Sequence, residues 1–455
     1  MADAELQLLS AGEKRAIALD DEERPPPPDK GNLVFFIILL HGIGTLMPWN
    51  MFLNISYDYY ETYKMLENST MNPETGAVTG SPSVYSANFQ SYQMIAAQIP
   101  NLLLNFINIF VVVRGDLVKR ISISLSIVAV AVLSTMIFIY IDTSNWVSTF
   151  FVITIITIIV LNGANGIYQN SIFGLASDFP FKYTNAVIIG NNLCGTFVTV
   201  LSIATKAFTK NVLDRAFAYF SISLLTLGCC FASFFVLKTK AFYIFFTEKA
   251  ARQRVSDNKN GSSGSFQSYL STFKQAFWAL INVYLVFFAT LAIFPGIMMY
   301  VRDEKPGEPY SFPLPQNYFM DVTTFLLFNV FAFFGSLLAG SIQWPSPGYL
   351  WIPVYLRLLF IPYFAMCNYL PYERSYPVWF PSTWGFVIMG ALMSISSGYF
   401  SGLAMMYAPK SVDPSKARTV GMMAGFFLIF GIVSGLLFTM LVKLVITAGT
   451  PINSQ

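Results

Sequence analysis

The stretch Asn162–Gly174 reads NGANGIYQNSIFG, and it ends a long apolar run. In a helix, Asn162, Asn165 and Gln169 occupy positions i, i+3 and i+7, so that three uncharged amides share one face. An amide in hydrocarbon without a hydrogen bond costs several kcal/mol. We therefore expect this face to meet a neighbouring helix, a water-filled cavity or a bound polar solute. Glycines within the stretch are typical of close helix packing, so the stretch alone leaves packing and binding open.

The composition indicates a membrane protein with many spans. Of the 455 residues, 55% are hydrophobic and 11% are charged, whereas soluble domains carry about 25% charged residues. The segment 1–32 is charged and proline-rich, without the apolar region of a signal peptide, and we expect it to be a disordered cytosolic tail. The net charge of +3 is spread along the chain, which excludes a basic patch for nucleic acid.

Apolar segments long enough to span a bilayer recur along the chain. We predict eleven spanning helices, near 33–55, 88–113, 121–141, 150–174, 184–208, 216–237, 276–300, 319–343, 350–370, 384–407 and 419–447. The segment 238–275 is basic and then Gly/Ser-rich, which predicts a flexible cytosolic linker. The predicted fold is therefore an all-α polytopic membrane protein, with one bundle of helices at 33–237 and a second at 276–455.

The distribution of Lys and Arg predicts the orientation, because these residues favour cytosolic loops. With the amino terminus in the cytosol, the cytosolic segments hold the larger share of basic residues, including Arg114, Lys119, Arg120, Lys238 and Lys240. The odd number of spans then places the carboxyl terminus outside the cell. The sequon at Asn68 falls in a long loop on the predicted outer side, which makes it a candidate glycosylation site.

Neutral polar residues recur at helical spacing in other segments as well. In the second segment they are Gln98, Asn101, Asn105 and Asn108; the fifth contains Asn192, and the eighth Asn329. Several helices thus direct amides inward, which favours a central polar cavity over packing alone.

Acidic residues are nearly absent from the predicted spans, and proton or sodium coupling generally uses carboxylates inside the membrane. The pattern favours a facilitator for an uncharged, planar, polar solute. We expect no metal and no cofactor. A single histidine, His41, cannot build a hydrolase site alone, so we predict that the protein is not an enzyme and interpret His41 as a packing residue.

Two motifs resemble the equilibrative nucleoside transporter family. They are GTLMPWN at 44–50 and QNSIFGLA at 169–176, and shorter similar stretches continue to Ala408-Pro409-Lys410. From the residues alone, Trp49 fits either a wall of the cavity or the neighbourhood of a Gly/Pro kink. The resemblance implies a fold related to the major facilitator superfamily and sodium-independent transport of nucleosides by alternating access.

The resemblance also implies residue roles. The tryptophan and glutamine that contact the nucleoside in that family correspond to Trp49 and Gln169. Leu46 and Leu53 correspond to apolar cavity positions, and further cavity positions correspond to Gln98, Asn101, Asn165 and Ile432. The residues themselves suggest Asn192 and Asn329 as additional polar contacts.

One departure concerns the eighth segment, where Ala332 and Ser336 stand at positions that hold Asp and Arg in better-known members of the family. This difference leaves open whether free nucleobases are carried as well as purine or pyrimidine nucleosides. An organic cation or monoamine carrier of the same family is the alternative. As partners we expect the nucleoside and membrane lipid, with no obligatory protein partner, and as location the plasma membrane.

Overall fold

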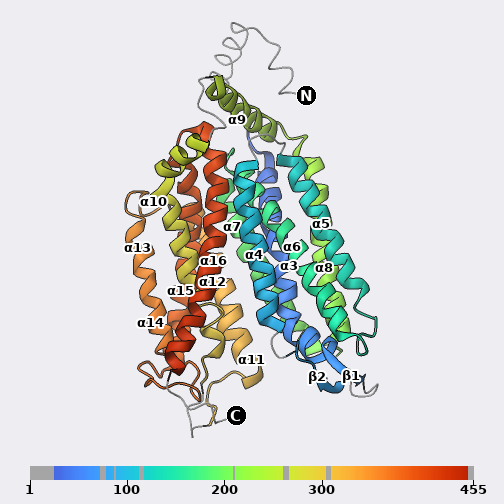
Figure 1. Ribbon diagram of the computed structural model, residues 1–455. Helices are drawn as coiled ribbons and strands as arrows, with labels where there is room; N and C mark the ends of the chain where they lie inside the picture. The colour runs from blue at the N-terminus through green and yellow to red at the C-terminus, as the bar shows by residue number, and fades with distance from the viewer. Residues whose placement is uncertain are drawn as a thin grey trace.

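Two bundles of nearly parallel helices lie side by side (Figure 1). The structure is a computed structural model, and it describes residues 25–71, 78–86, 89–111, 117–208, 211–259, 266–303 and 309–448. Most helices run the whole height of the molecule, as expected for segments that must satisfy their backbone hydrogen bonds within a bilayer.

The first bundle contains α3 (Leu33–Ile55), α4 (Phe89–Val111), α5 (Leu117–Ile137), α6 (Val147–Ala176), α7 (Lys182–Phe208) and α8 (Val212–Leu237). The second bundle contains α10 (Phe266–Leu291), α11 (Gln316–Met320), η5 (Asp321–Leu326), α12 (Leu327–Ser341), α13 (Trp351–Leu356), η6 (Arg357–Leu359), α14 (Phe360–Ala365), α15 (Thr383–Lys410) and α16 (Ala417–Thr447). Short 3-10 turns η1 (Lys30–Asn32), η4 (Met298–Tyr300) and η7 (Pro414–Lys416) precede or join helices.

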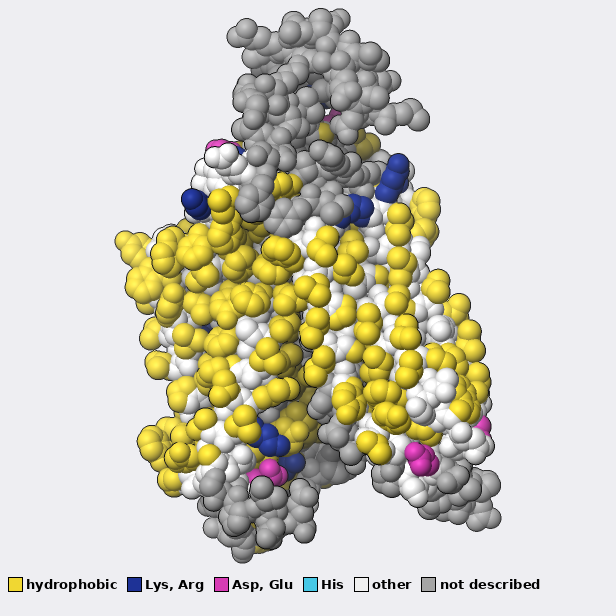
Figure 2. Space-filling model, in the orientation of Figure 1, with side chains coloured by type: hydrophobic (Ala, Val, Ile, Leu, Met, Phe, Trp, Pro, Cys, Tyr) yellow, Lys and Arg dark blue, Asp and Glu magenta, His cyan; other side chains and the backbone are white. Residues whose placement is uncertain are grey.

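On the face shown in Figure 2, side chains along the height of both bundles are mostly apolar. Nine helices in the described part of the chain are long and apolar enough to cross a membrane. The other two predicted spans coincide with α4 and with the broken segment α13–η6–α14, which contains Pro353 and Pro362. The all-α membrane fold is confirmed, whereas the count of eleven spans stays a prediction.

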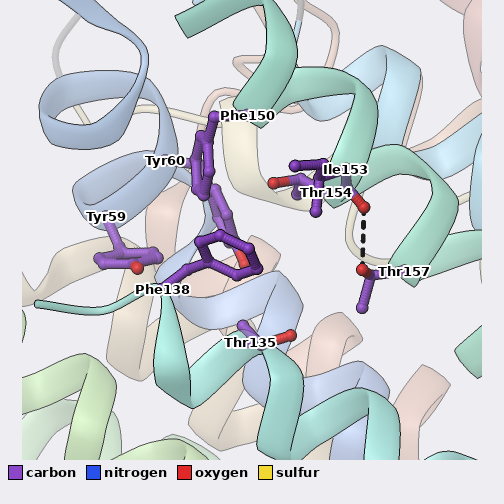
Figure 3. Close-up of a pocket in the computed structure, with 8 residues that line it drawn as sticks. All are labelled: Tyr59, Tyr60, Thr135, Phe138, Phe150, Ile153, Thr154 and Thr157. Atoms are coloured by element: carbon purple, nitrogen blue, oxygen red, sulfur yellow. Dashed lines mark hydrogen bonds between the residues drawn. The ribbon is translucent and has the colours of Figure 1, made fainter. Parts of the chain in front are cut away.

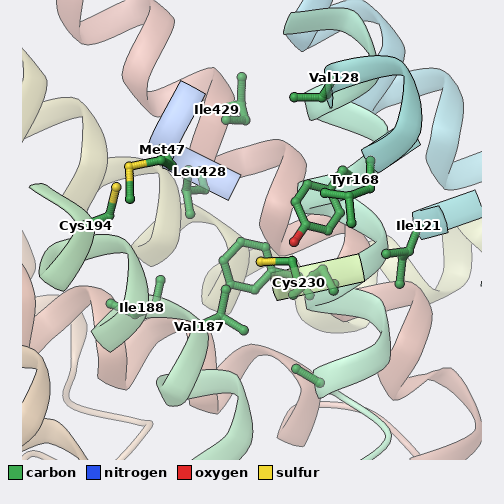
Figure 4. Packing of buried hydrophobic residues seen from close by; sticks show 14 of the residues in the cluster. Met47, Ile121, Val128, Tyr168, Val187, Ile188, Cys194, Cys230, Leu428 and Ile429 are labelled. Carbon is green, nitrogen blue, oxygen red and sulfur yellow. The ribbon is translucent and has the colours of Figure 1, made fainter. Parts of the chain in front are cut away.

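Tight helix pairs build the interior of each bundle. A Cβ built on Gly190 of α7 would overlap the Leu39 carbonyl of α3, and one built on Gly398 of α15 would overlap the Ala332 carbonyl of α12. Small residues at these crossings allow the backbones to touch. Buried side chains from α3, α5, α6, α7, α8 and α16 fill the space beside them (Figure 4).

One expectation about the loops was wrong, and a second loop contains secondary structure that the sequence analysis did not predict. The predicted flexible linker contains α9 (Ala241–Lys259), and α10 begins at Phe266, ten residues before the predicted span at 276. Helix α9 is held because Phe242 packs against Phe179 and Tyr183, with ring centroids 6.0 and 5.1 Å away. The long loop after α3 contains the π-helix η2 (Ser56–Lys64) and an antiparallel hairpin, β1 (Leu66–Met71) with β2 (Val78–Pro82).

The molecule has two distinct ends, the α9 end and the hairpin end, which carries β1 and β2 (Figure 1). Towards the α9 end the bundles meet: Arg418 of α16 forms an ion pair with Asp178, just beyond α6, and a Cβ on Gly421 of α16 would overlap Ser177. At the hairpin end the two bundles part (Figure 2).

Candidate functional site

The second half of α6 is buried on almost every side, and it contains Gln169. The Gln169 side chain is 1% exposed. Among the described residues, neither its Oε1 nor its Nε2 has a hydrogen-bond partner. Burying an amide without hydrogen bonds costs free energy, and within a bilayer no surrounding water can supply the missing bonds. This unpaired amide makes Gln169 the first candidate for contact with a bound polar group.

Two further amides near Gln169 each have an oxygen without a partner among the described residues. Asn165, one turn earlier on α6, donates from Nδ2 to the Thr45 carbonyl of α3 at 2.8 Å, while its Oδ1 has no partner among the described residues. Asn101 of α4 lies against Gly166, because a Cβ there would be 2.5 Å from Asn101 Oδ1, and this oxygen is unpaired as well. Helices α4 and α6 thus bring together several hydrogen-bonding atoms that have no described protein partner.

Asn162 behaves differently from the rest of the predicted amide face. Its Nδ2 donates to the Ile158 carbonyl of the same helix at 2.9 Å. On the predicted face, Asn165 and Gln169 therefore keep polar atoms without a described partner, whereas Asn162 forms a hydrogen bond within α6.

The amides predicted on α7 and α12 meet at the seam between the bundles. Asn192 Nδ2 donates to the Ala332 carbonyl at 3.4 Å. Asn329 Nδ2 donates to Thr199 Oγ1 at 3.2 Å and to the Phe325 carbonyl at 2.9 Å. Their donor groups already have protein partners, in contrast to Gln169.

The predicted apolar residues are half-buried. Leu46, Trp49 and Leu53 follow one another at helical spacing on α3, and Leu46 and Trp49 pack against the main core, as does Ile432 of α16. Gln98 is also half-buried, on α4. All ten predicted binding residues thus lie on α6, on helices that contact α6, or on α7 and α12, which contact each other between the bundles.

A second amide cluster, which sequence analysis did not separate from the first, begins at Asn170, the residue after Gln169, and includes Asn105 and Asn108 of α4. Asn170 Nδ2 donates to Asn105 Oδ1 at 2.6 Å and to the Met422 carbonyl of α16 at 2.7 Å. Asn108 Nδ2 donates to Asn170 Oδ1 at 2.8 Å, and Arg120 of α5 donates to Asn108 Oδ1. Asn105 and Asn108 belong to this paired network, although their spacing placed them on one face with Gln98 and Asn101.

The internal charge Arg357 is satisfied by neutral oxygens. Its guanidinium donates to Ser396 Oγ at 3.2 Å, to the Val286 carbonyl at 2.9 Å and to Thr290 Oγ1 at 2.7 Å. These bonds join η6 to α10 and α15 within the second bundle.

A small pocket in the first bundle is a poor candidate for substrate. It lies between η2, α5 and α6, with Tyr59, Tyr60, Phe138 and Phe150 as aromatic walls (Figure 3). Its cavity volume is about 10 Å³, far below the range of about 300–1,000 Å³ that is usual for ligand sites. None of the predicted binding residues lines it.

Comparisons with known proteins agree with this arrangement. The sequence profile described as nucleoside transporter matches residues 155–444. The chain belongs to the nucleoside transporter family. It is 28% identical over 455 residues to equilibrative nucleoside transporter 1 of Homo sapiens, with 91% of this chain and 97% of the relative covered. It is 24% identical over 410 residues to equilibrative nucleotide transporter 1 of Arabidopsis thaliana, covering 87% and 82%.

Solved structures of the major facilitator superfamily share the fold. The proton:xylose symporter XylE superposes with a TM-score of 0.57 at 10% identity, covering 90% of this chain and 88% of that one. FucP in the outward conformation gives a TM-score of 0.52 at 13% identity, covering 90% and 91%. The predicted fold class and family are confirmed.

Proposed function

We propose that this protein is a facilitative nucleoside transporter that moves its substrate down a concentration gradient by alternating access. Gln169 carries the proposal, because it is a buried amide with both polar atoms unpaired among the described residues. One carboxamide offers a donor and an acceptor side by side, which suits the edge of a purine or pyrimidine base. The chain belongs to a family of nucleoside transporters.

The other predicted residues would complete the site. Trp49 would supply an aromatic surface for the base, and Leu46, Leu53 and Ile432 would supply apolar walls. Gln98, Asn101 and Asn165 would add polar contacts close to Gln169. Asn192 and Asn329 would contact the sugar once the seam between α7 and α12 loosens, because their donors are engaged across that seam.

The orientation follows from the charges. Lys182, Lys238, Lys240, Lys249 and Lys410 belong to segments at the α9 end, which favours a cytosolic location for that end. In the plasma membrane, the amino terminus would then be cytosolic, and the carboxyl terminus and the hairpin end would be extracellular. Contact between the bundles at the α9 end, together with their separation at the hairpin end, would correspond to an outward-facing state.

The test is uptake of labelled adenosine, uridine and adenine into cells that lack their own nucleoside carriers. We expect saturable, sodium-independent nucleoside uptake that accelerates when unlabelled nucleoside is present on the far side, as a carrier requires. Uptake of adenine would extend the substrate range to nucleobases. The uncharged side chains of Ala332 and Ser336 leave this possibility open.

The matched variants are Gln169→Ala and Asn162→Ala, each of which removes one buried amide from α6. Gln169→Ala should lower nucleoside uptake at least tenfold at equal surface protein, and Asn162→Ala should not, because Asn162 bonds within its own helix. Uptake of an organic cation in place of all three solutes would overturn the proposal.

A further inference from the structure

The single histidine of the chain joins three helices of the first bundle. His41 lies on α3 and its side chain is 0% exposed. Its Nδ1 is 2.7 Å from the hydroxyl of Tyr168 on α6, and its Nε2 is 3.0 Å from Ser233 Oγ on α8. The sequence suggested a packing residue, but both ring nitrogens form specific polar contacts.

The directions of these hydrogen bonds follow from counting donors. The Ser233 hydroxyl donates to the Cys230 carbonyl at 2.6 Å, so its oxygen is left to accept from His41 Nε2–H. A neutral imidazole carries one N–H, so Nδ1 must accept, and the Tyr168 hydroxyl donates to it. The result is a directed chain of hydrogen bonds from α6 through α3 to α8.

Tyr168 is the residue before Gln169, and it is held closely against α3. A Cβ built on Gly44 would be 3.0 Å from the Tyr168 hydroxyl and 2.6 Å from Cys230 Sγ. Figure 4 shows the Tyr168 ring with its hydroxyl directed toward Cys230. One turn earlier on the same helix, Asn165 donates to the Thr45 carbonyl of α3.

These two attachments tie the rotation of α6 to the position of α3. Adjacent residues of a helix are separated by about 100°, so a rotation that moves Tyr168 moves Gln169 by the same angle. Without the bond to the His41 ring, the Tyr168 hydroxyl keeps a weaker contact to the His41 backbone carbonyl at 3.4 Å and a hydrogen bond with the Cys230 side chain. The bond therefore bears on the direction in which the unpaired amide of Gln169 points.

We propose that His41 is a positioning residue for substrate recognition: through Tyr168 it sets the rotation of α6 and aims the Gln169 amide at the nucleoside. This inference rests on the proposed function of Gln169. His41 itself does not touch the substrate; its ring serves as acceptor toward α6 and donor toward α8, a combination that Phe or Leu cannot provide.

The test is a double-mutant cycle on the KM of uridine uptake, with His41→Phe and Gln169→Ala, alone and combined. Uptake is followed to millimolar substrate and divided by surface protein. We expect His41→Phe to raise KM by roughly threefold to tenfold with Vmax per surface molecule unchanged, as for the loss of one neutral hydrogen bond. In the Gln169→Ala background, His41→Phe should cause no further rise in KM.

A purely structural histidine would give another pattern. Surface protein would fall while KM stayed the same, or KM would rise by the same factor in both backgrounds, and either result would overturn the inference. Tyr168→Phe provides a second route, since it removes only the hydroxyl and should reproduce the KM of His41→Phe without adding to it. Ser233→Ala leaves the bond between Tyr168 and His41 in place, so it should have the smallest effect.

The two proposals fail in different ways. If Gln169→Ala leaves KM unchanged, the proposed binding site is wrong. If Gln169→Ala raises KM but neither His41→Phe nor Tyr168→Phe does, the role of His41 alone is wrong.

Discussion

Gln169 and Asn170 are neighbours on α6 and have the same functional group, yet the structure treats them differently. Their exposed fractions are 1% and 0%. Asn170 is hydrogen-bonded to α4 and to the backbone of α16, whereas Gln169 has no partner for either polar atom among the described residues. Burial and functional group are alike here, so the hydrogen-bond partners separate the paired amide of Asn170 from the unpaired amide of Gln169.

The difference extends along the helix axis. Towards the α9 end, amides and an ion pair join the two bundles and are satisfied by each other. Around Gln169, Asn165 and Asn101 also keep an unpaired oxygen. In a carrier, the paired groups would hold the α9 end closed, and the unpaired amides around Gln169 would form hydrogen bonds with the substrate.

The largest expected effect belongs to the paired cluster. Asn170→Leu removes the donor to Asn105 Oδ1 and to the Met422 carbonyl, and the acceptor for Asn108 Nδ2. Each buried group left unpaired costs about 1–3 kcal/mol, so we expect a fall of roughly 3 kcal/mol or more in the free energy of unfolding.

Thermal unfolding of the purified protein measures this effect, with Asn162→Leu as the control on the same helix. The control should change the unfolding temperature much less, because Asn162 bonds only a carbonyl of its own helix in the described hydrogen bonds. Equal losses in the two variants would show that the hydrogen bonds of Asn170 to other helices stabilise the fold no more than the bond of Asn162 within its own helix.

A smaller effect is expected from Asp178→Asn, which weakens the ion pair between the bundles. The Asp178 side chain is 2% exposed, so Arg418 loses a largely buried counter-charge in the closed state. A destabilisation of about 1 kcal/mol would shift the ratio of closed to open α9 ends roughly fivefold.

Spin labels on the exposed residues Lys119 of α5 and Ser411, which follows α15, report this shift as a longer distance between bundles. Asp142→Asn, which removes an exposed carboxylate between α5 and α6, is the matched control and should leave the distances unchanged. A distance distribution unaffected by Asp178→Asn would show that the ion pair does not hold this end closed.

The smallest effect concerns the hairpin end. Asn68 lies in β1, on the side proposed to face outward. Asn68→Gln should remove one glycan, seen as a faster band on a gel and as resistance to a glycosidase, with nucleoside uptake unchanged. A native protein that carries no glycan at Asn68 would contradict the proposed extracellular location of the hairpin end.

Periodicity and length predicted the membrane helices because spanning a bilayer imposes both on the sequence. The break in α13–η6–α14 had a visible signal in Pro353 and Pro362, which the prediction of one span at 350–370 did not use. Helix α9 was missed because its packing depends on Phe179 and Tyr183, which are distant in the sequence.

The candidate site was predicted in part. Spacing placed Gln169, Asn165 and Asn101 on inward faces of α6 and α4, where the structure has them. It could not separate Gln169 from Asn170, because the pairing of an amide depends on which side chains the neighbouring helices present. The sequence could not predict the contacts of His41 either, because they depend on side chains that α6 and α8 present to it.

The most direct test of the central claim is thermal unfolding of the purified wild-type protein and Gln169→Leu, each with and without nucleoside. At one hundred times the Kd, a bound nucleoside should stabilise the wild type by about 2.7 kcal/mol. We predict that Gln169→Leu unfolds without ligand at the wild-type temperature or above it, since an unpaired buried amide is removed, and that nucleoside gives no further stabilisation. A lower unfolding temperature without ligand, together with a full response to nucleoside, would show that Gln169 supports the fold and does not bind substrate.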